Sequence, residues 1–226
     1  MSPRPSAAAA ATRTGAARTI SGEGTEHLRQ ADPVMRELID TFGPLDEVLA
    51  RRGPRPDRPY GALLRSIVGQ QLSTYAARAI WERVLALYDG RVPSPEELLA
   101  TDPEELRAAG NSRPKIAYMR SLAEHVISGE LELDHLDELS DDEITAELTA
   151  VKGIGEWSAD MFLLFHLGRP DILPVGDLGI RRAAQQAYGL RKLPTPDRLK
   201  RLARPWQPYR SLASLYLWRS LNTDPV

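Results

Sequence analysis

The sequence predicts an all-α fold, and three observations carry that prediction. Apolar residues recur at helical spacing, most clearly over residues 156–167. Helix-start signals are frequent, because Ser94, Thr101 and Ser140 each precede a glutamate by three residues. No segment has the alternating pattern of a convincing strand. We therefore expect a chain of helices and tight turns, long enough at 226 residues to form two helical lobes.

Composition bounds the kinds of site that this fold can carry. Hydrophobic residues make up 42% of the chain, which is typical of a globular protein. There is no cysteine, so a disulfide framework, a zinc ribbon and a cysteine-ligated iron–sulfur cluster are excluded. The four histidines are scattered without ligand-like spacing. The net charge of −2 is unfavourable for a nucleic-acid partner, unless a local basic patch or backbone amides make the contact.

The N-terminal residues 1–24 are predicted to form a disordered tail. They are rich in Ala, Ser, Thr, Arg and Pro, a composition that cannot bury a core. The alanine run Ala7–Ala11 is too weakly apolar for a signal peptide, and an organelle transit peptide is a minor alternative. No apolar run approaches the roughly 18 residues of a membrane span. We therefore expect a cytoplasmic protein that has no membrane partner.

The first helix is predicted to begin at Asp32–Pro33, since a capping residue followed by proline is a common helix start. Its apolar residues Val34, Leu38 and Ile39 are expected to face inward. Short helices should follow the capping boxes at Ser94 and Thr101. The other helices that the pattern predicts here are 44–51, 60–68, 74–88, 178–188, 196–203 and 208–221.

Two positions in the first half of the chain leave alternatives open. Residues 69–73, Gly-Gln-Gln-Leu-Ser, interrupt a helical pattern, and their simplest interpretation is a polar helix junction. Ser112 is predicted to cap a helix that carries Arg113 and Lys115 in its first turn. Cations there oppose the helix dipole. They are either part of a solvated surface or contacts to phosphate, and the sequence alone does not decide between these.

The segment 141–167 is predicted to be a helix, a tight hairpin and a second helix. Ser140 and Glu143 would start the first helix, and Gly153 and Gly155 would let the backbone reverse through positive φ. The outward-pointing amides at the start of a helix can bind an anion such as phosphate. Asp177 follows 22 residues after Gly155 at the start of another predicted helix, where its plainest role is an N-cap.

The residues of this hairpin match a known motif. They are Leu148, Val151, Gly153, Ile154, Gly155, Ser158 and Ala159. With Asp177 at its position after them, the chain resembles the helix-hairpin-helix (HhH-GPD) DNA glycosylases, and within them the 3-methyladenine DNA glycosylase II (AlkA-like) branch. The resemblance covers about residues 60–221. It implies two helical lobes, residues 25–59 with 178–226 and residues 60–177, without the N-terminal β-sheet lobe of some relatives.

The resemblance also implies roles for individual residues. Asp177 would be the catalytic carboxylate, and Trp157 and Trp218 would stack on the alkylated base. Trp157 stands where the lyase members carry a nucleophilic lysine, so strand cleavage is not expected. Gln71 would fill the gap that a flipped nucleotide leaves. Further contacts to DNA would come from Ser73, Lys115, Lys152, Gly153 and Gly155. The backbone carbonyls of Thr149, Val151 and Ile154 would hold a monovalent cation, Na⁺ or K⁺; no other cofactor is expected.

The function that the resemblance implies is that of a monofunctional glycosylase. It would flip an alkylated base out of double-stranded DNA and hydrolyse its N-glycosidic bond, which leaves an abasic site. We expect a monomer in a bacterial cytoplasm, associated with the nucleoid. Two alternatives stay open at this point: a glycosylase for mismatched or oxidised bases, and a DNA-binding module without enzymatic activity that has kept the hairpin.

Overall fold

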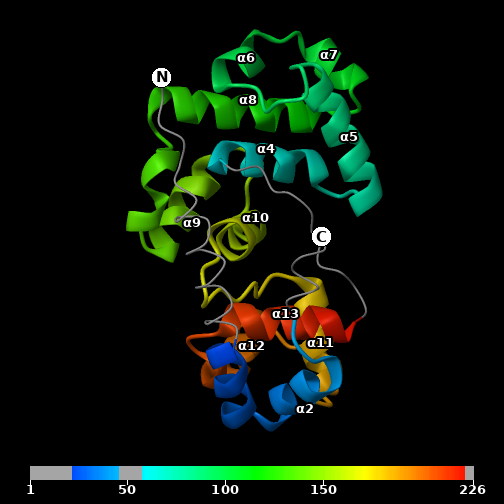
Figure 1. Ribbon diagram of the computed structural model, residues 1–226, viewed down its shortest axis with the longest axis vertical. Helices are drawn as coiled ribbons and strands as arrows, with labels where there is room; N and C mark the ends of the chain where they lie inside the picture. Colours follow the sequence, from blue (N-terminus) through cyan, green and yellow to red (C-terminus); the bar gives the residue numbers. More distant parts are fainter. Residues whose placement is uncertain (1–21, 46–57, 222–226) are drawn as a thin grey trace. The chain divides into compact units, whose positions relative to one another are not determined.

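The computed structural model describes residues 22–45 and 58–221, and this part of the chain consists of helices and turns without a strand (Figure 1). The predicted all-α fold is confirmed. The predicted tail over residues 1–21 lies outside the described residues, and so do residues 46–51 of the helix predicted over 44–51. Residues 44 and 45 are described and are not helical, so the predicted start of that helix is wrong. No helix in the described part is both long and apolar enough to span a membrane. The labelled elements are α2 (Pro33–Phe42), α4 (Pro59–Gly69), α5 (Thr74–Ala86), α6 (Pro95–Ala100), α7 (Pro103–Ala108), α8 (Arg113–Ser128), η1 (Leu133–Glu138), α9 (Asp141–Ala150), α10 (Glu156–Phe162), η2 (Leu163–Leu167), α11 (Leu178–Ala187), α12 (Pro196–Leu202), η3 (Arg204–Trp206) and α13 (Arg210–Ser220).

The chain divides into two compact units. Unit 1 comprises Met1–Gly53 and Pro170–Pro225, and unit 2 comprises Pro54–Arg169. The sequence placed these boundaries later, after residues 59 and 177. The difference matters for the candidate site, because Asp177 belongs to unit 1 together with the helix α11 that it caps.

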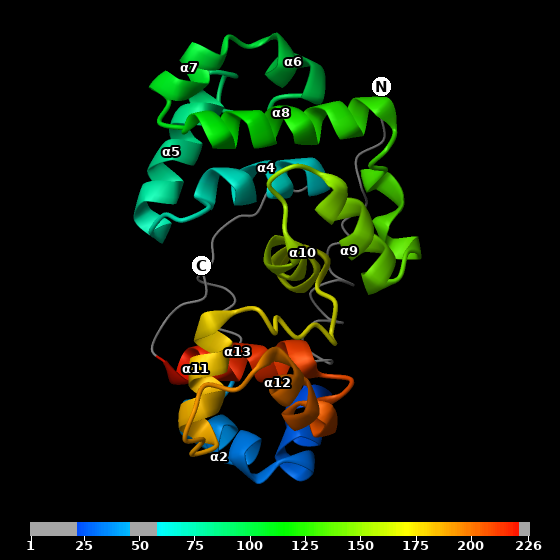
Figure 2. The same cartoon turned by 180° about the vertical axis from the view of Figure 1, so that it is seen from behind.

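Helix α13 is the centre of unit 1 and packs against both α2 and α11 (Figures 1 and 2). It buries Tyr216, Leu217 and Trp218. The Tyr216 hydroxyl donates a hydrogen bond of 3.1 Å to the Gly43 carbonyl, which joins α13 to the end of α2. Arg210 at the start of α13 makes two hydrogen bonds to the Asp171 carboxylate, of 2.7 and 2.8 Å. These contacts hold the chain on either side of residue 177.

A helix over residues 22–31 was not expected from the sequence. The prediction of a tail through residue 24 is wrong for residues 22–24. Leu28 in this helix is fully buried. A Cβ added to Gly24 would lie 2.8 Å from the Tyr209 ring, so this position packs too closely for a larger residue. The sequence signal was weak because one buried leucine and a packed glycine give no visible periodicity.

Asp32 does more than start α2. Its Oδ1 accepts hydrogen bonds from the amides of Val34 and Met35, at 2.8 and 3.2 Å. Its Oδ2 accepts from the Tyr188 hydroxyl at 2.6 Å and from the Trp206 indole at 3.0 Å. Burial raises the pKa of Tyr188, and the hydrogen bond to Asp32 raises it further. The cap therefore also joins α2 to two distant parts of unit 1.

The inward face of α2 differs from the prediction. Met35 and Ile39 are buried, whereas Val34 and Leu38 are only partly covered. Of the three residues predicted to face inward, only Ile39 is buried. The spacing of four residues between Met35 and Ile39 marks the true inner stripe.

We expect Asp32→Asn to lower the free energy of unfolding by about 1–3 kcal/mol, because an amide has one acceptor atom where the carboxylate has two. Either the cap of α2 or the pair of donors from Tyr188 and Trp206 then loses its acceptor. The measurement is urea unfolding followed by tryptophan fluorescence. Asp40→Asn is the control, because Asp40 lies on the same helix and its side chain is 51% exposed. An equal loss of stability in both variants would contradict the role assigned to Asp32.

Unit 2 is built on α4, which packs against α5, α8, α10 and η1. Its buried residues are Gly61, Leu63, Leu64, Ile67 and Val68. Helices α6 and α7 pack on α8.

The helix starts in unit 2 largely follow the capping predictions. Ser94 and Glu97 form the predicted capping box. The box predicted at Thr101 is wrong, because Asp102 is the N-cap of α7 and accepts from the Glu104 amide at 2.9 Å. The Thr101 hydroxyl instead donates to the Glu97 carbonyl.

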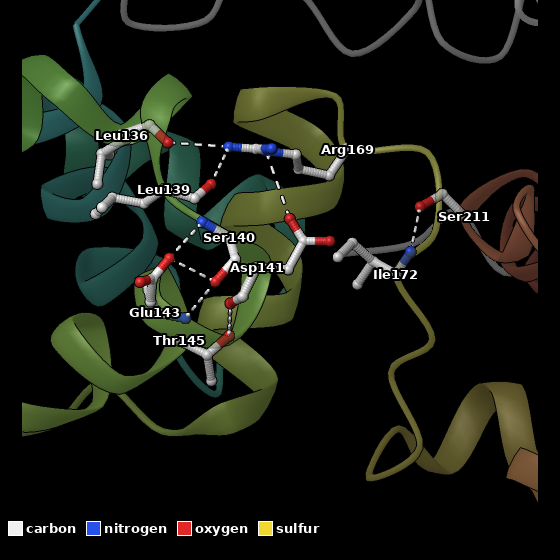
Figure 3. Close-up of polar contacts among 9 residues, drawn as sticks. All are labelled: Leu136, Leu139, Ser140, Asp141, Glu143, Thr145, Arg169, Ile172 and Ser211. Atoms are coloured by element: carbon white, nitrogen blue, oxygen red, sulfur yellow. Dashed lines mark hydrogen bonds and ion pairs between the residues drawn. The ribbon is translucent and has the colours of Figure 1, made fainter.

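Arg169 is the C-terminal residue of the segment that forms unit 2, and its side chain contacts the start of the hairpin region. One guanidinium nitrogen donates to the carbonyls of Leu136 and Leu139, both at 2.9 Å, and another lies 3.5 Å from the Asp141 carboxylate (Figure 3). The same view shows the predicted capping box of Ser140 and Glu143 at the start of α9. The beginning and the end of the hairpin region are thereby held together. In unit 1, the Ile172 amide donates to the Ser211 hydroxyl at 2.9 Å.

Candidate active site

Asp177 is held as the N-cap of α11. Its Oδ1 accepts a hydrogen bond of 2.7 Å from the Ile180 amide, and its backbone is extended with φ −69° and ψ 119°. The first amides of a helix lack intrahelical acceptors and favour negative charge. The predicted N-cap is confirmed by this geometry. The cap also fixes where the carboxylate lies, which is what a charge-stabilising group requires.

Trp218 on α13 is a second donor to the same carboxylate. Its indole Nε1 donates to Asp177 Oδ1 at 3.0 Å, across 41 residues of sequence. Only 4% of Trp218 is exposed, so most of its ring packs inside unit 1. The sequence placed Trp218 near Asp177 as a stacking surface for the base. The structure shows a hydrogen bond between the two side chains, which the sequence did not indicate, and the stacking role of Trp218 stays a prediction.

Gly179 makes this pairing possible. A Cβ at this position would lie 3.0 Å from Asp177 Oδ1 and 3.4 Å from two atoms of the Trp218 ring. A side chain here would press on both groups, so the glycine leaves room for the Asp177–Trp218 hydrogen bond. The Leu178 side chain next to Asp177 is 47% exposed.

The hairpin between α9 and α10 depends on Gly153. Its φ is 89°, and a Cβ there would lie 2.1 Å from the Tyr118 ring of α8. Gly155, by contrast, has φ −102° as the N-cap of α10, and a Cβ there would meet no atom within 4 Å. The prediction that both glycines reverse the chain through positive φ is therefore right for Gly153 and wrong for Gly155. Lys152 in this turn is exposed.

The junction between α4 and α5 lies against the hairpin within unit 2. The Gln70 side chain donates a hydrogen bond of 2.8 Å to the Gly153 carbonyl. Gln71, the next residue, is exposed and has φ 57°, a conformation that few residues other than glycine adopt. Such strain persists where surrounding contacts impose it, and it is common at functional sites. The structure thus presents Gln71 at a fixed, exposed turn beside the hairpin.

Ser73 and Lys115, which are also predicted to contact DNA, form hydrogen bonds within the protein. Ser73 is the N-cap of α5, and its hydroxyl accepts from the Ala76 amide at 3.3 Å. Lys115 donates from Nζ to the Val68 carbonyl at 2.8 Å, close to the C-terminal end of α4. Burial lowers the pKa of Lys115. A contact of either residue to DNA stays a prediction; the Lys115 ammonium has three N–H donors, so its hydrogen bond to Val68 leaves donors for a phosphate.

The tryptophans differ in burial. Trp81 and Trp206 are 7% and 0% exposed, so both are core residues. Trp157, in the first turn of α10, is only partly buried and belongs to unit 2. Its helix continues into the π-helical turn Leu163–Leu167 instead of staying α-helical to residue 167. A shared pocket of Trp157 and Asp177 stays a prediction.

The three carbonyls assigned to a cation stand at the end of α9 and in the turn after it. The last carbonyls of an α-helix have no intrahelical donor. The Val151 carbonyl accepts from the Ile154 amide at 3.1 Å, which uses one of its two lone pairs. Backbone oxygens are suitable ligands for a hard cation. Within the described residues, no group of three or more His, Asp and Glu side chains could hold a metal ion.

Comparisons with known proteins agree with this arrangement. A family model described as "HhH-GPD superfamily base excision DNA repair protein" matches residues 64–208. The DNA-3-methyladenine glycosylase 1 of Schizosaccharomyces pombe is 35% identical over 206 residues, which are 88% of this chain and 89% of that protein.

Solved structures show the same similarity. The S. pombe 3-methyladenine DNA glycosylase (Mag1) in complex with abasic DNA superposes with a TM-score of 0.78 and 33% identity, over 90% of this chain and 99% of that one. A DNA-3-methyladenine glycosidase from Bacillus halodurans gives a TM-score of 0.69 and 39% identity, over 85% of this chain and 90% of that one.

Proposed function

This chain belongs to the HhH-GPD superfamily of base excision DNA repair proteins, and from that premise we propose that it is a monofunctional DNA glycosylase for alkylated bases. It hydrolyses the N-glycosidic bond of bases such as 3-methyladenine and 7-methylguanine in duplex DNA and leaves an abasic site. The observation that carries this proposal is the Asp177 carboxylate, held by the Ile180 amide and the Trp218 indole.

The chemistry requires a fixed negative charge. When an N-glycosidic bond breaks, positive charge develops on the sugar, and a carboxylate close to the sugar stabilises it. At about 4 Å and an effective dielectric constant of about 20, opposite charges attract by about 4 kcal/mol. Since each 1.36 kcal/mol is about tenfold in rate, Asp177 supplies on the order of 10³. The two donors hold the carboxylate in place before the substrate arrives, and it can also orient the attacking water.

The choice of base follows from the aromatic residue at 157. An alkylated purine carries positive charge, and an indole face attracts it by about 0.5–2 kcal/mol. Trp157 on α10 is only partly buried, whereas the other three tryptophans are buried. Because position 157 is not a lysine, no amine is placed there to form a Schiff base, so base release is not followed by strand cleavage.

The duplex is engaged through unit 2. The Gly153–Gly155 turn offers backbone amides to a phosphate. Gln71 fills the space that the flipped nucleotide leaves, and the Gln70–Gly153 hydrogen bond connects the two contacts. The backbone carbonyls of Thr149, Val151 and Ile154 would hold a monovalent cation, which would add positive charge at the turn. We further propose that the enzyme acts as a monomer in the cytoplasm.

The test is release of free base from methylated duplex DNA, measured by chromatography, with strand cleavage measured on the same samples. We expect 3-methyladenine and 7-methylguanine to be released without strand breaks until alkali is added. A parallel panel of duplexes with 8-oxoguanine and with mismatched bases should give little release. Release from this panel alone would assign the enzyme to the other substrate class, and tight binding without any release would leave a DNA-binding module.

Trp218→Phe should slow base release about 10- to 100-fold. It keeps an aromatic ring but removes the N–H donor to Asp177, and a hydrogen bond to a charged group contributes about 1.5–3 kcal/mol. Single-turnover rates at saturating enzyme measure the effect. Tyr216→Phe is the matched control, because it removes a hydrogen bond of α13 that does not involve Asp177. Equal rates in the two variants would show that the indole does not position the carboxylate.

A further inference from the structure

The net charge of −2 conceals a strong asymmetry along the chain. Residues 58–169, the described part of unit 2, contain nineteen Asp and Glu against eleven Lys and Arg. Residues 178–221 of unit 1 contain ten Lys and Arg against one acidic residue, Asp197. The unit that carries the hairpin is therefore acidic, and the positive charge of this protein gathers on the helices that follow Asp177.

Most of these cations are exposed and have no acidic partner. Arg210 is bound to Asp171, and Arg181 donates to the Pro194 carbonyl. Seven others are exposed, and among the described residues none of their side chains forms an ion pair or a hydrogen bond. We call them the basic α11–α12 surface: Arg182, Arg191, Lys192, Arg198, Lys200, Arg201 and Arg204.

The helices hold this surface in place. Leu199 of α12 is fully buried, so this short helix packs on the rest of unit 1 through the side that carries Leu199. Arg198 and Arg201 are three residues apart and are neighbours on its surface. The hydrogen bond from Arg181 to Pro194 fixes the loop that carries Arg191 and Lys192 against α11, and Figure 2 shows this loop and α12 in orange.

A favourable interaction with the helix dipole does not explain why all of these cations occupy their positions. Cations in the last turn of a helix interact favourably with its dipole, by about 0.3–1 kcal/mol, and this applies to Lys200 and Arg201. It does not apply to Arg198, which lies in the first turn of α12, where the dipole disfavours a cation. Arg191 and Lys192 lie in a loop outside both helices.

The composition of the surface selects the kind of partner. Protein interfaces have an apolar centre and a polar rim. Within the described residues, no large hydrophobic side chain is exposed between residues 179 and 204. Exposed cations without an apolar centre suit a partner that carries many negative charges, and the phosphates of duplex DNA provide this.

We propose that the basic α11–α12 surface is a second DNA-binding surface, which contacts phosphates of duplex DNA irrespective of sequence and of damage. The proposal rests on the assignment of duplex DNA as the substrate. It adds non-specific affinity to the phosphate contact of the hairpin turn, whose unit carries an excess of carboxylates.

The test compares two triple variants of the full chain. Arg198→Gln/Lys200→Gln/Arg201→Gln removes three charges from the basic surface. Arg78→Gln/Arg91→Gln/Arg107→Gln removes three charges from unit 2, where each arginine has a glutamate partner. Dissociation constants are measured between 50 and 200 mM salt, for a duplex with an abasic analogue and for the same duplex undamaged. Thermal unfolding confirms that both variants are folded.

We expect the salt slope, log Kd against log salt concentration, to fall by about 2 to 3 in the basic-surface variant, since each lost phosphate contact removes about 0.9. The fall should be equal on both duplexes, and the control should keep the wild-type slope. A slope equal to that of the control, or a defect confined to the abasic duplex, would overturn the proposal.

Measuring base release distinguishes a failure of the proposed DNA-binding surface from a failure of the glycosylase assignment. At saturating concentrations, the basic-surface variant should release base at the wild-type rate. If the wild type releases no base but the slopes differ as expected, the glycosylase assignment fails and the surface stands. If base is released normally and the slopes agree, the surface fails and the enzyme stands.

Discussion

Asp177→Asn is expected to slow release of alkylated bases about a thousandfold without unfolding the protein. Asparagine is as good an N-cap as aspartate, and its oxygen can accept from both the Ile180 amide and the Trp218 indole. The substitution therefore preserves the local geometry and removes the negative charge. The loss of about 4 kcal/mol of attraction to the cationic sugar corresponds to about three orders of magnitude in rate.

The measurement is the single-turnover rate of 3-methyladenine release at saturating enzyme. Asp197→Asn is the charge-matched control, because Asp197 is exposed on α12 in the same unit. Binding to an abasic duplex should be affected little in either variant. If Asp177→Asn released base within about tenfold of the wild-type rate, the electrostatic role assigned to this carboxylate would be wrong.

Gly153→Ala is expected to lower the free energy of unfolding by about 2–5 kcal/mol and to weaken DNA binding. An alanine at φ 89° has an unfavourable backbone conformation that costs about 1–2 kcal/mol. Its methyl group would lie 2.1 Å from the Tyr118 ring, and forcing an extra carbon into a packed site costs about 1–3 kcal/mol. Either Tyr118 or the turn must move, and the turn carries both the hairpin amides and the acceptor of Gln70.

Gly155→Ala provides a control from the same turn. Its φ of −102° is available to alanine, and its added carbon would meet no atom within 4 Å. In thermal unfolding without DNA, Gly155→Ala should stay close to the wild type while Gly153→Ala unfolds at a clearly lower temperature. Similar stabilities of the two variants would show that Tyr118 does not constrain the turn.

The sequence by itself determined the all-α fold class, the family and where most helices begin. Asp32, Ser94, Ser112, Ser140 and Asp177 all cap the helices that follow them, as predicted. A cap acts on amides two or three residues away, so the signal is local and can be read directly. The order of the hairpin residues and of Asp177 was sufficient to indicate the family, and the tryptophan at 157 indicated the absence of a lyase nucleophile.

The predicted N-cap was wrong where two neighbouring residues are both suitable for that position. Thr101 and Asp102 are both good N-caps, and the structure uses Asp102 while the Thr101 hydroxyl bonds to the previous turn. The helix over residues 22–31 was missed because it packs at Gly24 against Tyr209 and Leu212. Neither residue is near it in the sequence.

Only the tertiary structure decided how the site is held. The Trp218–Asp177 hydrogen bond, the contact of Tyr118 with the Gly153 turn and the Lys115–Val68 hydrogen bond join residues that are 35 or more positions apart, as counted along the sequence. Such pairs depend on how helices pack, and no spacing rule within one helix reports them. The sequence identified a carboxylate and its local cap, and helix packing added the second donor, the Trp218 indole.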